Sequence, residues 1–265
     1  MISSTTNKQV KYVNALVKKA KSRREEDLFV AEGIRMCSEI PKDRIHSLYI
    51  SVSFQKHPEC AKLVQGVRHV EVVTDEVFKA LSDTQTPQGI LALVKQYHYT
   101  VDEAARTAHE TGVPAHLMIL ERLQDPGNLG TIIRAGEGAG VTGILMDKDT
   151  ADIYNPKVIR STMGSVLRVP FVYVDDLKAA LKSMKAKGIH LYAAHLKGQQ
   201  SYDKVDCRGD IGFLIGNEGN GLSDEIADMA DTYIRIPMAG CVESLNAAVA
   251  ASVLMFETAR QRRGS

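Results

Sequence analysis

The stretch from Ile211 to Ala251 constrains the fold most, because it contains two short strands that each end in a loop. Residues 211–215 form an apolar run with the length of a buried parallel strand. The next six residues, 216–221, include three glycines, which indicates a positive φ or a close approach to the backbone. A second short strand at 233–236 leads through a loop to an alanine-rich helix at 247–260. Open α/β sheets bind ligands at the carboxyl ends of their strands, so we expect a ligand beside these loops.

The glycine loop does not match a phosphate-binding fingerprint. Neither GxGxxG nor GxxxxGK[ST] is present, and no lysine follows the glycines. This disfavours a dinucleotide-dependent oxidoreductase. A nucleotide-like ligand at this place would be held by backbone N–H and C=O groups of the loops.

Strands alternate with helices throughout the second half of the chain, which begins at Pro114. The alternation predicts a mostly parallel, twisted sheet between helices. The expected strands are 116–120, 143–146, 171–174 and 190–194, and the expected helices are 128–139, 155–162 and 177–187.

A smaller α/β domain is predicted before it. Thr5 or Thr6 can cap a helix that runs through about Lys19, and strands then alternate with helices to residue 97. The expected strands are 28–31, 46–52, 70–74 and 89–94, and the expected helices are 33–40, 54–65 and 75–82. The expected organisation is an N-terminal domain at 1–97, a polar linker at 98–113 and a C-terminal domain at 114–265.

The composition of the 265-residue chain limits the function classes further. The formal net charge is +1, so the chain as a whole does not attract polyanions. The four cysteines lack a CxxC pair and the eight histidines lack ligand spacing, so we expect neither a metal site nor disulfides. The N-terminus lacks the apolar core of a signal peptide, and no apolar run approaches ~20 residues. We therefore expect a cytoplasmic protein without a membrane span.

Three segments resemble the motifs of the SpoU (TrmH-type) RNA ribose methyltransferases. DPGNLGTIIR at 125–134 is similar to motif 1, GNEGNGL at 216–222 to motif 2, and IPMAGCVESLNAAVA at 236–250 to motif 3. They stand in the family's order and spacing, and the resemblance covers residues 114–262. The segment FVAEG at 29–33 is similar to the start of the substrate-binding domain, itself like ribosomal RNA-binding proteins, that often precedes SpoU domains.

The resemblance implies a fold, a cofactor and an assembly. SpoU domains, of the SPOUT superfamily, form a deep trefoil knot and pair as homodimers with the cofactor sites near the interface. Their knot loops, here 194–198, 216–221 and 236–246, bind S-adenosylmethionine in a bent conformation through backbone groups. The cofactor-binding residues that it implies are His195, Leu196, Gly216, Asn217, Gly219, Ile236, Met238, Ser244 and Leu245.

Motif 1 supplies the expected catalytic arginine, Arg134, whose alternative role is that of a surface arginine on an amphipathic helix. The 2′-hydroxyl of a ribose must lose its proton as it accepts a methyl group. A guanidinium is normally protonated, so it is better suited to hold a phosphate and polarise the hydroxyl than to act as a base. The sequence leaves both roles open.

Four other motif residues each have a structural and a catalytic alternative. Asn128 caps its helix or lies beside the target ribose. Glu218 fixes the glycine loop or orients Arg134 by a charge-assisted hydrogen bond. Ser244 and Asn246 begin the last helix, contact the cofactor or the target hydroxyl, or do both.

Positive charge is concentrated at the two ends of the chain. Residues 1–24 contain seven lysines or arginines and no acidic residue, and the chain ends with Arg260-Gln261-Arg262-Arg263 followed by Gly-Ser. A charge run is either a solvated face or, in an RNA enzyme, a phosphate-contacting surface. The residues expected to contact RNA are Lys8, Lys11, Lys18, Lys19, Arg23, Arg24, Ser165 and Arg168, with strand entry as the alternative for the last two.

Together these features predict an α/β enzyme with a knotted C-terminal domain and a small ribosomal-protein-like domain before it. The expected reaction is S-adenosylmethionine-dependent methylation of a ribose 2′-hydroxyl in structured RNA, with ribosomal RNA favoured over transfer RNA. The alternative is a non-catalytic RNA-binding or ribosome-assembly protein that keeps the fold. The final helix, 245–260, is apolar over more of its circumference than a one-sided helix needs, which fits either a dimer interface or burial against the chain's own sheet. The resemblance to SpoU domains favours a homodimer through the C-terminal domain.

Overall fold

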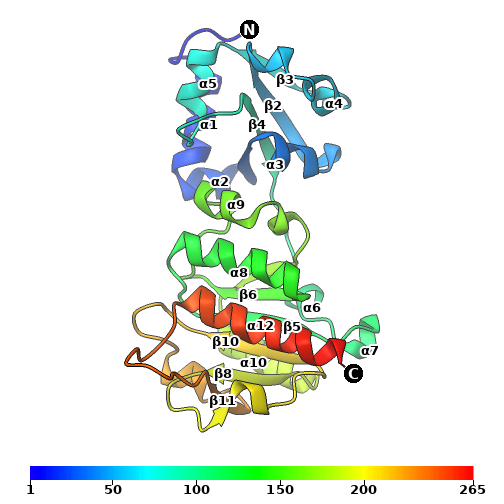
Figure 1. The fold of residues 1–265 in the computed structure, drawn as a ribbon. Coiled ribbons are helices and arrows are strands. Elements are labelled where there is room, and N and C mark those ends of the chain that lie inside the picture. Colours follow the sequence, from blue (N-terminus) through cyan, green and yellow to red (C-terminus); the bar gives the residue numbers. More distant parts are fainter. Residues whose placement is uncertain (265) are drawn as a thin grey trace. The chain divides into compact units, whose positions relative to one another are not determined.

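The computed structural model describes residues 1–264, which form two compact units (Figure 1). The N-terminal unit comprises Met1–Tyr97 and Asp152–Leu167. The C-terminal unit comprises His98–Ala151 and the chain from Arg168 onward. Within the described residues there is no helix of the length and apolarity that a membrane span requires.

A four-stranded sheet in the order β1-β4-β2-β3 forms the centre of the N-terminal unit. Its strands are β1 (Leu28–Glu32), β2 (Ile45–Ser51), β3 (Val70–Val73) and β4 (Ile90–Lys95). β4 is antiparallel to both neighbours, whereas β2 and β3 are parallel. The four strands lie where the alternating sequence pattern predicted them.

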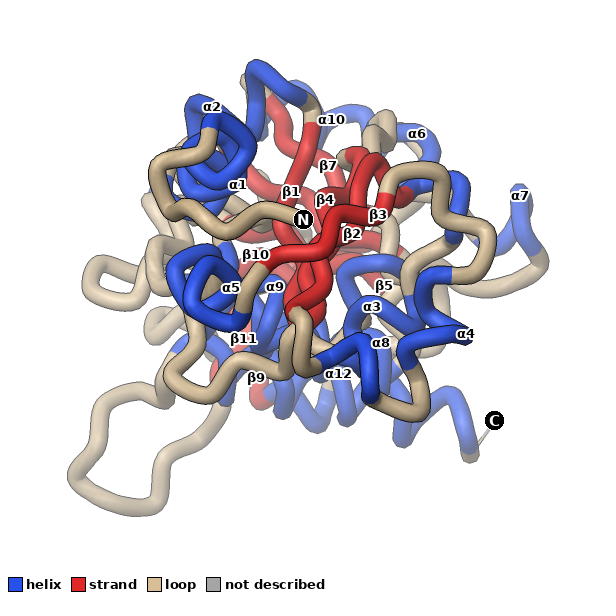
Figure 2. Tube along the Cα trace, turned by 90° about the horizontal axis from the view of Figure 1, so that it is seen from above, coloured by secondary structure: helices blue, strands red, loops and turns tan. Residues whose placement is uncertain are grey.

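Helices pack on both faces of this sheet. α1 (Lys8–Lys18) and α5 (Asp75–Leu81) lie on one side and α3 (Ile34–Glu39) on the other (Figure 2). The N-cap of α1 is Asn7, whose side chain accepts from the Gln9 N–H at 2.8 Å, so the prediction of a Thr5 or Thr6 cap is wrong. The short helices α2 (Ala20–Glu26) and α4 (Cys60–Val64) complete the part of the unit before Tyr97.

A later segment, 152–167, also belongs to the N-terminal unit, although we expected it inside the C-terminal domain. It contains α9 (Pro156–Thr162), which packs against β1. The Tyr154 ring stacks on that of Phe29, with the ring centroids 4.7 Å apart. The aromatic contact explains why this segment clusters with a strand more than a hundred residues earlier in the chain.

The expected linker, 98–113, forms two short helices of the C-terminal unit, α6 (Val101–Ala104) and α7 (Ala108–Thr111). Each begins with a capping box, in which a threonine and the glutamate three residues later satisfy each other's backbone N–H groups. Gly143 packs against α6 so closely that a Cβ there would lie 2.0 Å from the Ala104 carbonyl oxygen. These contacts make the segment part of the folded unit.

Seven parallel strands form the sheet of the C-terminal unit, in the order β7-β6-β5-β10-β8-β11-β9. The strands are β5 (His116–Leu120), β6 (Gly143–Asp147), β7 (Phe171–Val174), β8 (His190–Ala194), β9 (Gln200–Ser201), β10 (Ile211–Ile215) and β11 (Thr232–Arg235). All but β9 were predicted. Since every strand is parallel, the carboxyl ends of β8, β10 and β11 lie at the same edge of the sheet.

Helices cover both faces of this sheet as well. α10 (Leu177–Ala186) and α11 (Asp224–Ala227) share an apolar core with alternate residues of β5, β6, β8 and β10. α8 (Pro126–Ala139) and α12 (Ala247–Arg263) lie side by side across the other face (Figure 1). A Cβ on Gly136 of α8 would lie 3.5 Å from the Met255 sulfur, so a small residue allows the two helices to approach closely. The trefoil knot stays a prediction.

Candidate active site

A cavity of about 280 Å³ lies at the carboxyl ends of β8, β10 and β11 and is closed by the first turns of α12. Loops after each of the three strands contribute to its walls. The nine residues expected to bind a cofactor all line it: His195, Leu196, Gly216, Asn217, Gly219, Ile236, Met238, Ser244 and Leu245.

Several apolar residues of this lining were not among the predicted ones. Ile215 and Ile234 end β10 and β11, while Ala250 and Leu254 come from α12. They are ordinary core residues in the sequence, and their place in the cavity depends on how α12 packs on the strand ends. A signal was present in their position, since Ala250 lies inside motif 3 and the other three lie within four residues of motif 2 or motif 3.

Hydrogen bonds of Asn217 shape the glycine loop. Its backbone N–H and C=O pair with those of Gly221, and its Oδ1 accepts from the N–H groups of Gly219 and Asn220 at 2.9 and 3.1 Å. Gly221 has φ +67°, and a Cβ on Gly216 would lie 2.1 Å from the Gly221 carbonyl carbon. Two of the three glycines are therefore required by the turn itself.

Glu218 joins the glycine loop to the start of α8. Its Oε1 accepts from the Asp125 N–H at 2.9 Å and from Asn128 Nδ2 at 3.0 Å, and its Oε2 accepts from the Gln124 N–H at 3.1 Å. Partial burial acts to raise the pKa of the Glu218 carboxyl, but these hydrogen bonds outweigh it and lower the pKa overall. Glu218 is thus an ionised carboxylate that holds two N–H donors of motif 1 and that of the residue before it.

Asn128 in turn joins α8 to α12. Its Oδ1 accepts from Asn246 Nδ2 at 3.0 Å, while Asn246 Oδ1 caps α12 by accepting from the N–H groups of Ala248 and Val249. The cap of α8 is Asp125, which accepts from the Asn128 N–H at 2.8 Å, so the capping alternative for Asn128 is wrong. One residue of each predicted motif therefore contributes to a continuous chain of hydrogen bonds beside the cavity.

Comparison with known proteins agrees with this arrangement of motifs. Residues 115–256 match the SpoU rRNA Methylase family. The chain belongs to this family. Residues 7–92 match the MRM3-like substrate binding domain, which corresponds to most of the N-terminal unit before α9.

Individual SpoU proteins align over nearly the whole chain. The 23S rRNA (guanosine(2553)-2′-O)-methyltransferase RlmP of Bacillus subtilis is 30% identical and covers 96% of this chain and 97% of its own length. The AdoMet-bound rRNA methyltransferase of Sinorhizobium meliloti has a TM-score of 0.87 at 30% identity, covering 98% of this chain and 97% of that one. The AdoMet complex of AviRb from Streptomyces viridochromogenes has a TM-score of 0.87 at 26% identity, covering 98% and 99%.

The motif 1 arginine of this SpoU chain, Arg134, lies outside the hydrogen-bonded network. Its side chain is exposed on α8 and forms no hydrogen bond or ion pair with the described residues. The prediction that Glu218 orients Arg134 is not supported, because Glu218 bonds to residues 124–128 instead. Arg134 is six positions after Asn128, which places the two about 120° apart around an α-helix.

Ser244 and His195, two further predicted residues, both line the cavity but differ in their local contacts. Ser244 lines the cavity but does not cap α12, since Asn246 fills that position. His195 Nδ1 accepts from the Lys197 N–H at 3.1 Å, and its ring meets that of Tyr233 edge-on. His195 is therefore held by a hydrogen bond within its own loop and by the Tyr233 ring.

The predicted RNA-contacting residues divide into exposed and buried ones. Arg23 is 3% exposed and binds Asp152 at 2.6 Å while donating to the Leu16 and Val17 carbonyls, so it serves the core of its own unit. Ser165 is 2% exposed, which leaves little surface to offer an RNA. Those that are exposed are Lys8, Lys11, Lys18, Lys19, Arg24 and Arg168, the last paired with Glu137.

The basic C-terminal cluster is also partly structural. The Arg262 guanidinium donates to the backbone carbonyls of Pro114, Ala115, Cys207 and Gly209 at 2.7–3.2 Å. It thereby fixes the end of α12 beside the start of β5. Within residues 1–264 no group of three or more His, Cys, Asp or Glu side chains is arranged to hold a metal ion.

Proposed function

We propose that this SpoU protein transfers a methyl group from S-adenosylmethionine to a ribose 2′-hydroxyl of RNA. The observation that carries the proposal is the chain of hydrogen bonds from Glu218 through Asn128 to Asn246 beside the cavity. It joins one residue of each motif at a single place. A non-catalytic RNA-binding protein would have no need of this arrangement.

The lining of the cavity suits S-adenosylmethionine. Apolar side chains such as Ile215, Ile234 and Leu254 suit its adenine ring and methylene groups. Two carboxylates, Glu218 and Glu243, suit a ligand that carries a sulfonium and an ammonium charge. Arg235, at the end of β11, is the one lysine or arginine among the described residues that line the cavity, so the lining has no cluster of cations for a phosphate chain.

The chain's own residues would position the acceptor. S-adenosylmethionine, when bound, supplies an electrophilic methyl group on its sulfonium. Asn128 and Asn246 each use one N–H of the side-chain amide within the network, and the second N–H of each can donate to a ribose or phosphate oxygen. The Arg134 guanidinium would hold a phosphate and polarise the 2′-hydroxyl, since a permanently charged group is a poor base.

Ribosomal RNA is the proposed substrate rather than transfer RNA. The N-terminal unit matches a substrate-binding domain, and RlmP, a relative that covers 96% of this chain, is named for 23S ribosomal RNA. The exposed lysines of α1, Lys8, Lys11 and Lys18, would add phosphate contacts.

A homodimer through α8 and α12 is part of the proposal. Val249 and Phe256 on α12 are 49% and 46% exposed although both are large and apolar. They are seven residues apart, which places them on one face of the helix, and a Cβ on Gly138 of α8 would lie 3.7 Å from the Phe256 ring. Pairing along this face would allow Arg134 of one subunit to act at the cavity of the other.

Calorimetry with S-adenosylhomocysteine, NAD and ATP tests the proposed cofactor class. We expect saturable binding of S-adenosylhomocysteine alone, weakened by replacing Leu245 with a charged residue at the cavity wall. Binding of NAD or ATP in its place would contradict the proposal.

A further inference from the structure

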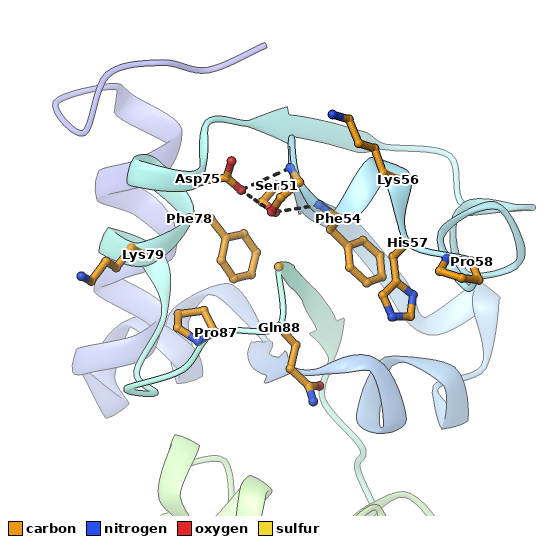
Figure 3. A pocket seen from close by; sticks show the side chains of 12 residues that line it. Ser51, Phe54, Lys56, His57, Pro58, Asp75, Phe78, Lys79, Pro87 and Gln88 are labelled. Carbon is orange, nitrogen blue, oxygen red and sulfur yellow. Dashed lines mark hydrogen bonds between the residues drawn. The ribbon is translucent and has the colours of Figure 1, made fainter.

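A second cavity, of about 550 Å³, lies entirely within the N-terminal unit (Figure 3). It lies beside the residues that follow β2, the first residues of α5 and the chain that enters β4. It is distinct from the cavity of the C-terminal unit, and the methyl-transfer chemistry does not use it. Its size is in the range of small-molecule sites.

A fixed carboxylate forms the polar wall. Asp75 Oδ1 accepts from the Ser53 hydroxyl at 2.5 Å and from the Ser53 N–H at 3.2 Å. Hydrogen bonding to Ser53 is the main cause that lowers the pKa of Asp75, so the group is ionised at neutral pH. Because both Ser53 bonds fall on Oδ1, Oδ2 is the oxygen that can accept from a ligand.

Aromatic rings form another wall. The exposed His57 ring stacks on the buried Phe54 ring, with the centroids 5.1 Å apart and the planes 13° apart. His57 Nδ1 also accepts from the Glu59 N–H at 3.1 Å, which fixes the orientation of the ring. A flat ligand can therefore stack on His57 without first ordering it.

Two lysines complete the site. Lys56 and Lys79 stand on different sides of the cavity (Figure 3), and both are exposed. Neither forms an ion pair with another of the described residues. An acceptor for N–H groups, a stacking ring and two cations are together the groups that recognise an unpaired nucleotide.

We propose that this cavity binds one unpaired nucleotide of the RNA substrate, with its base on His57 and its exocyclic amino group donating to Asp75. The phosphates on either side would meet Lys56 and Lys79. Adenine, cytosine and guanine carry such an amino group, whereas the N–H donor of uracil lies between two carbonyl oxygens that a carboxylate repels. This inference takes the ligand to be RNA and in that respect rests on the proposed function.

Fluorescence anisotropy of the full chain with short, labelled single-stranded oligoadenylate, oligocytidylate and oligouridylate tests the inference. We expect the wild type to bind the first two more tightly than oligouridylate. Asp75→Asn keeps an acceptor for Ser53 and should weaken binding of oligoadenylate by about tenfold, while oligouridylate should bind equally well or better. His57→Ala should weaken all three by about tenfold, because stacking tolerates any base.

Glu76→Gln is the matched control, since it removes the same charge from the next residue of α5, outside the cavity. Losing a negative charge favours RNA binding by general electrostatics, so this variant should bind equally well or better. If Asp75→Asn also binds oligoadenylate better, or if His57→Ala changes nothing, the nucleotide site is refuted. S-adenosylhomocysteine binding, measured in parallel, reports separately on the proposed function.

Discussion

Arg134 is the residue whose role matters most for the proposed chemistry. Arg134→Ala should lower the rate of methyl transfer by at least about 100-fold, as loss of a transition-state charge contact does. Arg134→Lys should lower the rate of methyl transfer similarly, because an ammonium cannot reproduce a planar, bidentate contact. The affinity for S-adenosylhomocysteine should stay within a few-fold, measured by calorimetry.

The control for this prediction is Arg260→Ala, which removes an exposed arginine of α12 that pairs with Glu257. It should leave methyl transfer near the wild-type rate. Wild-type turnover by Arg134→Ala would remove that arginine from the mechanism.

His116 makes stability depend on pH. Its side chain is fully buried at the start of β5, and burial, with a smaller effect of Arg262, lowers its pKa to about 3. Between pH 6.5 and 3 the unfolded chain binds a proton here and the folded chain does not, so stability is present above pH 6.5 and falls below it. The expected loss is about 1.4 kcal/mol per pH unit.

Denaturant unfolding of the wild type and His116→Leu between pH 4.5 and 8 measures this contribution. The difference between their free energies of unfolding should change with that slope below pH 6.5 and be constant above it. His109→Leu, an exposed histidine of α7, is the control and should keep the wild-type profile. If the free energies of unfolding of wild type and His116→Leu change in parallel with pH, His116 does not cause the pH dependence of stability.

At the scale of elements, the returning segment 152–167 should stabilise the N-terminal unit. Asp152→Ala leaves the buried Arg23 guanidinium without its carboxylate and should lower the free energy of unfolding by about 3 kcal/mol. Asp83→Ala breaks the more exposed ion pair with Arg160 and should lower the free energy of unfolding by no more than about 1 kcal/mol. Chemical denaturation of both variants compares them, and equal losses would show that the Arg23 pair has no special role.

The cavity, the Arg23 ion pair and segment 98–113 show which features the sequence could predict and which it could not. A ligand site at the strand ends could be predicted because parallel strands bring their carboxyl ends together, and the resemblance of the local motifs to SpoU proteins implied its residues. The buried, structural role of Arg23 could not be predicted, because its partner Asp152 is 129 residues away and nothing local distinguishes Arg23 from Arg24. Likewise, capping boxes in 98–113 were visible as Thr-x-x-Glu, but the polar composition suggested a linker.

At the scale of the whole molecule, a homodimer is expected. Sedimentation equilibrium at micromolar concentration should give twice the 29.1 kDa mass of one chain. Phe256→Glu places a charge on the exposed apolar face of α12 and should shift the mass to that of one chain. Val113→Glu, at another exposed apolar position, should leave the dimer intact. A wild-type mass of one chain with full methyl transfer would contradict the dimer.

The central claim is that this protein methylates a ribose 2′-hydroxyl of ribosomal RNA. The most direct test maps 2′-O-methylated nucleotides in ribosomal RNA from cells with and without the protein. We predict that a specific nucleotide loses its 2′-O-methyl group when the protein is absent. The purified wild-type protein with S-adenosylmethionine should restore the group and Arg134→Ala should not. Identical methylation maps from the two strains would contradict the claim.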